Sequence, residues 1–142
     1  MEILIRDALP ADAGPIAELL GQLGYPATAE QIPQRLGRMR AEPDQHVLVA
    51  DVAGEVVGVA TVIVRHVINA DEPFGRLASV VVAEGWRGKG IGGALIAEAE
   101  RICAAAGCAL IEVTSGAHRP RAHDFYRRLG YAAKPERFIK RL

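Results

Sequence analysis

The chain has 142 residues, of which 50% are hydrophobic and 24% charged, with 17 Lys/Arg balanced by 17 Asp/Glu. A chain of this length fits one domain with its own core, so we expect residues 1–142 to form a single domain. No apolar run approaches the roughly 20 residues that span a bilayer, and the start does not resemble a signal peptide. These features argue against a membrane protein and a membrane partner, and they predict a cytoplasmic protein.

Charge is unevenly distributed along the chain. From Ser115 onward there are eight Lys/Arg and two Asp/Glu, a net +6, whereas the rest carries −6. A basic C-terminal quarter indicates contact with an anion, either a phosphate-bearing cofactor or nucleic acid, although a solvated basic face has the same composition. We expect no nucleic-acid partner, because the aromatic residues of this quarter resemble core positions more than an exposed stacking row.

Cysteine and histidine usage does not indicate a metal site. Cys103 and Cys108 match neither a zinc ligand set nor a disulfide framework, and both lie in apolar segments. His118 and His123 lack carboxylates at suitable spacing. We therefore expect two core thiols and no metal.

The N-terminal quarter predicts a strand and two helices. Residues 1–8 favour a strand, and a short helix follows that ends near Gly24. Thr28 and Gln31 form a capping-box pattern for a second helix. Pro33 would fall too deep in that helix for a regular start and would cost a backbone hydrogen bond, so we expect this helix to be irregular.

Three strands are predicted next. Residues 46–52 and 55–67 are rich in Val and Ile and flank Ala53-Gly54, which indicates an antiparallel hairpin. Residues 69–75 favour a loop. Residues 77–82 are a nearly continuous apolar run of the kind found near the centre of a sheet.

The remaining residues predict alternating elements. Residues 90–106 have apolar side chains at helical spacing, residues 109–114 favour a strand, and residues 119–129 favour an amphipathic helix. The tail, residues 131–142, is expected to supply one or two last strands. The order predicts a mixed α/β fold instead of a strictly alternating one.

A glycine-rich turn joins the apolar strand at 77–82 to the long helix. The first N–H groups of a helix have no internal partners and point outward at the positive end of its dipole. Glycines allow a ligand to approach that backbone closely, and Arg87 and Lys89 add positive charge. A tight turn that needs glycine only for its dihedral angles is the alternative, but four glycines in residues 88–93 favour phosphate binding.

Two common phosphate motifs fit this turn poorly. A Walker-type loop needs Ser or Thr after Gly-Lys, whereas Gly90 follows Gly88-Lys89. Gly88, Gly90 and Gly93 match the dinucleotide pattern G-x-G-x-x-G. However, five residues separate that pattern from the strand, the preceding strands form a hairpin, and too few residues follow to complete a doubly wound domain.

The sequence resembles the GNAT superfamily of N-acetyltransferases at two motifs. Arg87-Gly88-Lys89-Gly90-Ile91-Gly92, preceded by Trp86, resembles the signature R/Q-x-x-G-x-G/A. Residues 122–131, Ala-His-Asp-Phe-Tyr-Arg-Arg-Leu-Gly-Tyr, resemble the second signature A-x-x-F-Y-x-x-x-G-F/Y. The resemblance implies a mostly antiparallel mixed sheet of six to seven strands, splayed between its two central strands and flanked by about four helices.

The resemblance also implies site residues and a cosubstrate, acetyl-CoA. The backbone of the strand before the glycine turn would bind the pantetheine arm and polarise the acetyl carbonyl. Tyr126 would protonate the departing thiolate, although a purely structural aromatic role is the alternative. The residues expected to bind the cofactor are Val80, Val81, Val82, Arg87, Gly88, Lys89, Gly90, Ile91, Gly92, Gly93, Arg119 and Tyr126.

The sequence departs from the family pattern twice. Arg119 stands where many members have Asn, and it either contacts the cofactor phosphates or is exposed. Ala78 stands where some members have a glutamate base, so another group must accept the proton that the amine loses. The candidates are Glu84, Glu112, His66 and Asp71, and a salt bridge to a neighbour is the alternative role of Glu112.

These residues lead to one function and two alternatives. We expect an acetyl-CoA-dependent N-acetyltransferase in which a primary amine attacks the thioester directly, without a nucleophilic Cys or Ser. The acceptor, a small molecule or a peptide, is not readable from the sequence, and a homodimer stays open. The alternatives are a CoA-binding regulatory protein of the same fold without turnover, and the nucleic-acid-binding module disfavoured above.

Overall fold

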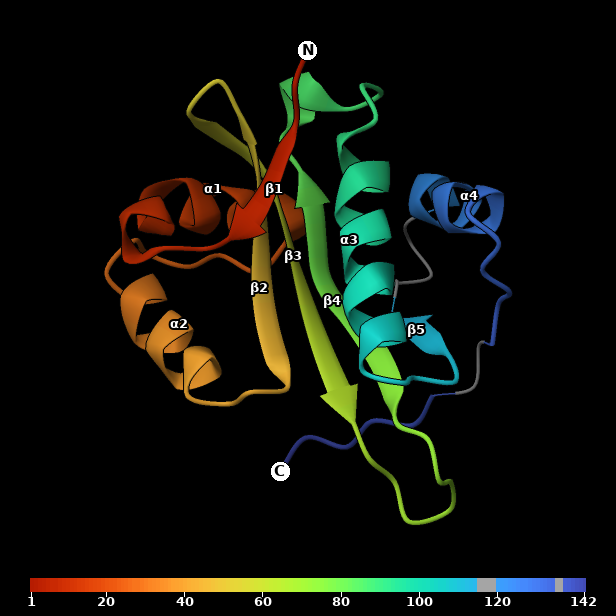
Figure 1. Cartoon of the computed structure of the whole chain (residues 1–142). Coiled ribbons are helices and arrows are strands. Elements are labelled where there is room, and N and C mark those ends of the chain that lie inside the picture. Colours follow the sequence, from red (N-terminus) through yellow and green to blue (C-terminus); the bar gives the residue numbers. More distant parts are fainter. Residues whose placement is uncertain (115–119, 135–136) are drawn as a thin grey trace.

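The structure is a computed structural model that describes residues 1–114, 120–134 and 137–142. Within those residues one sheet has the order β1-β2-β3-β4-β5, antiparallel except for the parallel pair β4 and β5. Helices α1 and α2 cover one face, α3 covers the other, and α4 lies beside α3 (Figure 1). The strands are β1 (Leu4–Asp7), β2 (Gln45–Val52), β3 (Glu55–Arg65), β4 (Phe74–Val82) and β5 (Ile111–Val113). The helices are α1 (Ala13–Leu23), α2 (Ile32–Arg40), α3 (Ile91–Ala105) and α4 (Pro120–Arg128), with short 3₁₀ turns η1 (Pro10–Asp12) and η2 (Glu84–Trp86).

The predicted mixed α/β fold is confirmed, but the expected number of strands is wrong. Among the described residues the sheet has five strands instead of six or seven, and the described residues of the tail belong to none of them. Phe138 and Ile139 are adjacent in the sequence, so in a strand they would point to opposite faces. Both are exposed, at 95% and 65%. A tail without an alternating apolar face cannot bury one side against the sheet, which explains the difference.

The second helix begins later than the sequence indicated. α2 starts at Ile32, so Pro33 lies in its first turn, where a proline costs no hydrogen bond. The Gln31 side chain accepts a hydrogen bond from the Thr28 N–H at 3.0 Å, which shapes the turn before the helix. The expectation of an irregular helix was therefore wrong.

The hairpin between β2 and β3 is confirmed. Ala53 and Gly54 form its two-residue turn with φ of 51° and 88°, the left-handed pair that matches the twist of the flanking strands. Asp51 Oδ1 accepts a hydrogen bond from the Gly54 N–H at 2.8 Å. This bond helps to hold Ala53 in a backbone conformation that non-glycine residues seldom adopt.

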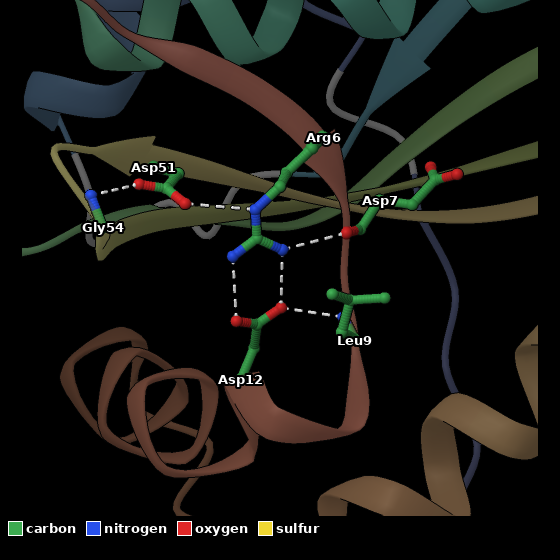
Figure 2. Close-up of polar contacts among 6 residues, drawn as sticks. All are labelled: Arg6, Asp7, Leu9, Asp12, Asp51 and Gly54. Atoms are coloured by element: carbon green, nitrogen blue, oxygen red, sulfur yellow. Dashed lines mark hydrogen bonds and ion pairs between the residues drawn. The ribbon is translucent and has the colours of Figure 1, made fainter.

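A charged cluster fastens the hairpin and the start of α1 to β1 (Figure 2). The Arg6 guanidinium donates to both carboxylate oxygens of Asp12, at 2.8 and 3.0 Å, and to Asp51 Oδ2 at 3.1 Å. Asp12 is only 6% exposed and also accepts the Leu9 N–H at 2.7 Å. A nearly buried carboxylate with three hydrogen bonds is well compensated for its lost hydration.

Candidate active site

The site lies where β4 runs beyond its parallel neighbour. The pairing of β4 with β5 covers Gly75 to Leu77, where Leu77 lies opposite Val113. β4 continues to Val82, and within the described residues no strand pairs with that side of residues 78–82. Backbone N–H and C=O groups on an unpaired strand edge can bind an extended ligand.

A β-bulge reshapes this part of β4. The β3–β4 register shifts between Val59 and Thr61, and Ser79 has a φ of 53°. Leu77 packs in the core under α3, whereas Val81 packs in the core under α1 and α2. Residues an even number apart in a regular strand share a face, so the bulge reverses the alternation.

A side-chain hydrogen bond supports the bulge. The Thr61 hydroxyl donates to the Ala78 carbonyl at 2.7 Å, across from the distorted residue. The sequence analysis missed this feature, because a nearly continuous apolar run has no alternation in which a shift could be seen. Ser79, the polar residue of that run, was the available signal.

The glycine turn forms an open cradle at the end of β4. Gly88 and Gly90 have φ of 79° and 83°, which L side chains rarely adopt, and Gly90 is the N-cap of α3. A Cβ at Gly88, Gly90 or Gly93 would meet no heavy atom within 4 Å. The N–H groups of residues 91–93 precede the first intrahelical bond, from Ala94 N–H to Gly90 carbonyl. Amides without an intrahelical acceptor at the start of a helix suit a phosphate group.

The two cations of the turn lie at the rim of this cradle. Arg87 Nε donates to the Val82 carbonyl at 3.1 Å, so its guanidinium lies over the end of β4. Lys89 Nζ is 5.9 Å from the centroid of the Trp86 ring. Both cationic residues are exposed, and their charge adds to the positive end of the α3 dipole.

Helix α4 meets the same corner through Phe125. A Cβ added at Gly92 would lie 3.1 Å from Phe125 Cζ and 3.7 Å from Val82 Cγ2. Gly92 therefore leaves room for Phe125 beside the end of β4. Tyr126, the next residue, is half-buried against the core under α3. The structure thus brings the residues of both motifs to one corner of the sheet.

Comparisons with known proteins bear on this arrangement. The model of the Acetyltransferase (GNAT) family matches residues 16–131. The chain belongs to the GNAT family. The prediction of a GNAT N-acetyltransferase, an acyltransferase enzyme, is confirmed.

Individual GNAT relatives cover most of the chain. It is 35% identical over 131 residues to the aminoglycoside N(6')-acetyltransferase type 1 of Stenotrophomonas maltophilia, covering 89% of this chain and 84% of that protein. It is 34% identical over 128 residues to the aminoalkylphosphonate N-acetyltransferase of Salmonella typhimurium, covering 89% and 80%. The fold is shared with a transcriptional regulator from Bacillus halodurans C-125, with a TM-score of 0.91 at 22% identity, covering 99% and 100% of the two chains.

The candidate bases of this GNAT protein lie in different places. Glu112 pairs with Arg76, whose Nε donates to Glu112 Oε1 at 2.8 Å across the β4–β5 register. Glu84 is exposed in η2, where its backbone N–H donates to Gln22 of α1 at 2.9 Å. His66 and Asp71 lie in the β3–β4 loop, at the opposite end of β4 from the glycine turn (Figure 1). Nine residues of strand separate that loop from the turn, about 30 Å.

Arg119 lies outside the described residues. Cys103 is buried, and burial raises the pKa of its thiol to about 11, so it is an unreactive core group. The described residues contain no cluster of three or more His, Cys, Asp or Glu side chains arranged to hold a metal. In the described part of the chain, no helix is long and apolar enough to cross a membrane.

Two hollows on the described surface lie away from the glycine turn. One of about 630 Å³ is bounded by α1 and the start of β3 and includes Asp12, Glu18 and Glu55. Another of about 270 Å³ lies between α2 and the start of β2. Both are open to solvent, and neither includes residues 78–93.

Proposed function

We propose that this GNAT protein transfers the acetyl group of acetyl-CoA to a primary amine by direct attack in a ternary complex. The observation that carries the proposal is that the unpaired edge of β4 at residues 78–82 is followed, through η2 and the glycine turn, by the amides at 91–93, which have no intrahelical acceptor. An extended pantetheine arm fits the first, and a diphosphate fits the second.

Different residues of this chain would bind the different parts of acetyl-CoA. Backbone amides at residues 91–93, with Arg87 and Lys89, would hold the diphosphate. Backbone groups of Val80, Val81 and Val82 would hold the arm and donate to the acetyl oxygen. Such prearranged donors stabilise the negative charge that develops in the transition state. The chain therefore contributes mainly position and charge stabilisation.

The proposed acetyl transfer needs one group that donates a proton and one that accepts a proton. The amine nitrogen bonds to the acetyl carbon, the C–S bond breaks, and the electron pair leaves on sulfur. Tyr126 would give its hydroxyl proton to that sulfur and recover one from solvent. The attacking nitrogen would lose its proton to a carboxylate, directly or through water.

Glu112 is the first base to test and Glu84 the second. Ile111 and Val113 pack in the core under α3, so Glu112 between them lies on the opposite face of the sheet. Its partner Arg76 is two residues before Ala78, where the unpaired edge begins. To accept a proton from the amine, Glu112 would have to give up a hydrogen bond to Arg76.

The acceptor class follows from the relatives. We propose small amine-bearing molecules, and aminoglycosides and aminoalkylphosphonates are the first two groups to test. The experiment is steady-state thiol release from acetyl-CoA with a panel of both groups. Saturable turnover with one group supports the proposal. Saturable CoA binding without turnover on any amine would instead favour the regulatory alternative, for which Ala78 in place of a glutamate is the supporting feature.

A paired substitution tests the cradle. Gly90→Ala and Gly107→Ala both place a side chain at a positive φ, 83° and 82°, in otherwise open space. Each should destabilise the fold by about 1 kcal/mol. Only Gly90→Ala should raise the KM for acetyl-CoA, by tenfold or more, because Gly107 lies at the opposite end of α3 from the turn. Equal effects of the two substitutions on that KM would contradict the proposed cradle.

A further inference from the structure

Helix α4 ends in a backbone arrangement that brings two tyrosines together. Gly130 has a φ of 94°, and its N–H donates to the Arg127 carbonyl at 3.0 Å. The Tyr131 N–H donates to the Tyr126 carbonyl at 3.0 Å. This pair of hydrogen bonds is the Schellman motif, in which the residue after the glycine packs on the residue five positions earlier. The Gly-Tyr ending of the second motif thus places Tyr131 against Tyr126.

The ring of Tyr126 is held between two others. Its centroid is 5.7 Å from that of Tyr131 and 5.2 Å from that of Phe125, at interplanar angles of 66° and 68°. These are edge-to-face contacts, which depend on orientation as well as on distance. A change in the position of either neighbour would therefore tilt the Tyr126 ring.

Each neighbouring ring is anchored on α3. Phe125 lies against Gly92 in the first turn of α3, as described above. The Tyr131 hydroxyl donates to Glu100 Oε2 at 2.9 Å. Gly92 and Glu100 are eight residues apart, about 12 Å along the helix. The three rings therefore connect α4 to α3 at two separated points, with Tyr126 between them.

Helix α4 packs against the core under α3 through aromatic side chains. Its residues that pack against the core under α3 are Phe125 and Tyr126, joined by Tyr131 just after the helix. Burial, followed by the hydrogen bond to Glu100, raises the pKa of Tyr131 well above its ordinary value, so its hydroxyl stays a donor at physiological pH. The bond to Glu100 is thus a steady constraint on the C-terminal end of α4.

We propose that Tyr131 and Glu100 are positioning residues that set the orientation of Tyr126. This inference rests on the proposed function, in which Tyr126 gives its proton to the departing thiolate. A proton donor must point at the accepting atom, so a shift of its ring lowers the rate of the chemical step more than the affinity for substrates.

The test uses Tyr131→Phe, which removes the hydroxyl and keeps the ring. The kcat should fall about tenfold while the KM for acetyl-CoA stays within about twofold, because a hydrogen bond to a charged group is lost away from the binding surface. Glu100→Ala should reproduce this fall, whereas Glu100→Gln keeps an acceptor oxygen and should retain most of the activity. Glu98→Ala is the matched control, since Glu98 is paired with Arg101 on the same helix, and it should leave kcat unchanged.

A double-mutant cycle separates positioning from general stability. In a Tyr126→Phe background, Tyr131→Phe should cause no further fall in kcat if Tyr131 acts through the Tyr126 hydroxyl. A kcat of the double variant that falls by the product of the two single losses, or an unchanged kcat in Tyr131→Phe alone, would overturn the inference. If Tyr126→Phe itself leaves kcat unchanged, the acid role in the proposed function fails, and that outcome is read independently of Tyr131. Circular dichroism and thermal unfolding of each variant establish that it is folded.

Discussion

The close approach of α3 to β4 makes a sharp prediction at Gly75. A Cβ at this position would lie 2.3 Å from Cys103 Sγ and 3.2 Å from Cys103 Cβ. Cys103 is 3% exposed, so its side chain has no room to move into solvent. Overpacking a core typically costs 1–3 kcal/mol, and a 2.3 Å contact is at the severe end. Alanine is favoured over glycine in a strand by only about 0.5–1 kcal/mol. We therefore expect Gly75→Ala to lower the free energy of unfolding by about 2–3 kcal/mol.

The assay is chemical denaturation of the wild type, Gly75→Ala, Cys103→Ala and the double variant. Removing the sulfur eliminates the 2.3 Å contact and leaves the 3.2 Å one, so Cys103→Ala should restore part of the loss, with a coupling of about 1–2 kcal/mol. Gly37→Ala, in α2 with no atom within 4 Å of its added Cβ, should be neutral or stabilising. Additive effects at Gly75 and Cys103, or a Gly75→Ala variant as stable as the wild type, would refute the packing that positions α3 and its amides.

Two further predictions concern the charged cluster around Arg6 and the β-bulge in β4. The hydrogen bond from Arg6 lowers the pKa of Asp12. Its stabilisation is therefore complete above the ordinary aspartate pKa of about 3.9 and is lost as the pH falls through the folded-state value. Asp12→Asn should cost about 2 kcal/mol at pH 7 and flatten the acid limb of the stability profile, and an unchanged acid limb in urea titrations would contradict this. Thr61→Val removes the hydrogen bond to Ala78 and should cost about 1 kcal/mol. Because this bond supports the bulge, kcat should also fall, and an unchanged kcat would contradict that support.

Local chemistry made much of the fold predictable. The left-handed glycine that ends α1 and the two-residue turn between β2 and β3 follow from backbone preferences that a short segment already contains. The start of α2 was misjudged because a capping-box pattern looks the same whether it opens a helix or shapes the turn before it. The expectation of six to seven strands came from the family resemblance, and the tail has no alternating apolar face that would fix a strand register.

The site was predictable where backbone chemistry alone suffices. The glycine turn before α3 is visible in the sequence, and the amides of residues 91–93 that follow it have no intrahelical acceptor. The pairing of Arg76 with Glu112 depends on the parallel register of β4 and β5, which joins residues 36 positions apart. The bulge at Ser79 depends on the register between β3 and β4, for which a polar residue in an apolar run was the available local signal. The contact of Tyr131 with Glu100 likewise requires α4 to be placed on α3.

The central claim is that the free edge of β4 and the first amides of α3 bind acetyl-CoA, and residue-resolved amide hydrogen exchange tests it most directly. The account predicts that CoA slows exchange at residues 91–93 and at some of residues 78–82, with exchange in α2 unchanged. Titrating CoA over the same samples should give one saturation curve for both segments. Unchanged exchange in both segments at a CoA concentration far above the KM for acetyl-CoA, or protection confined to a different part of the chain, would contradict the account.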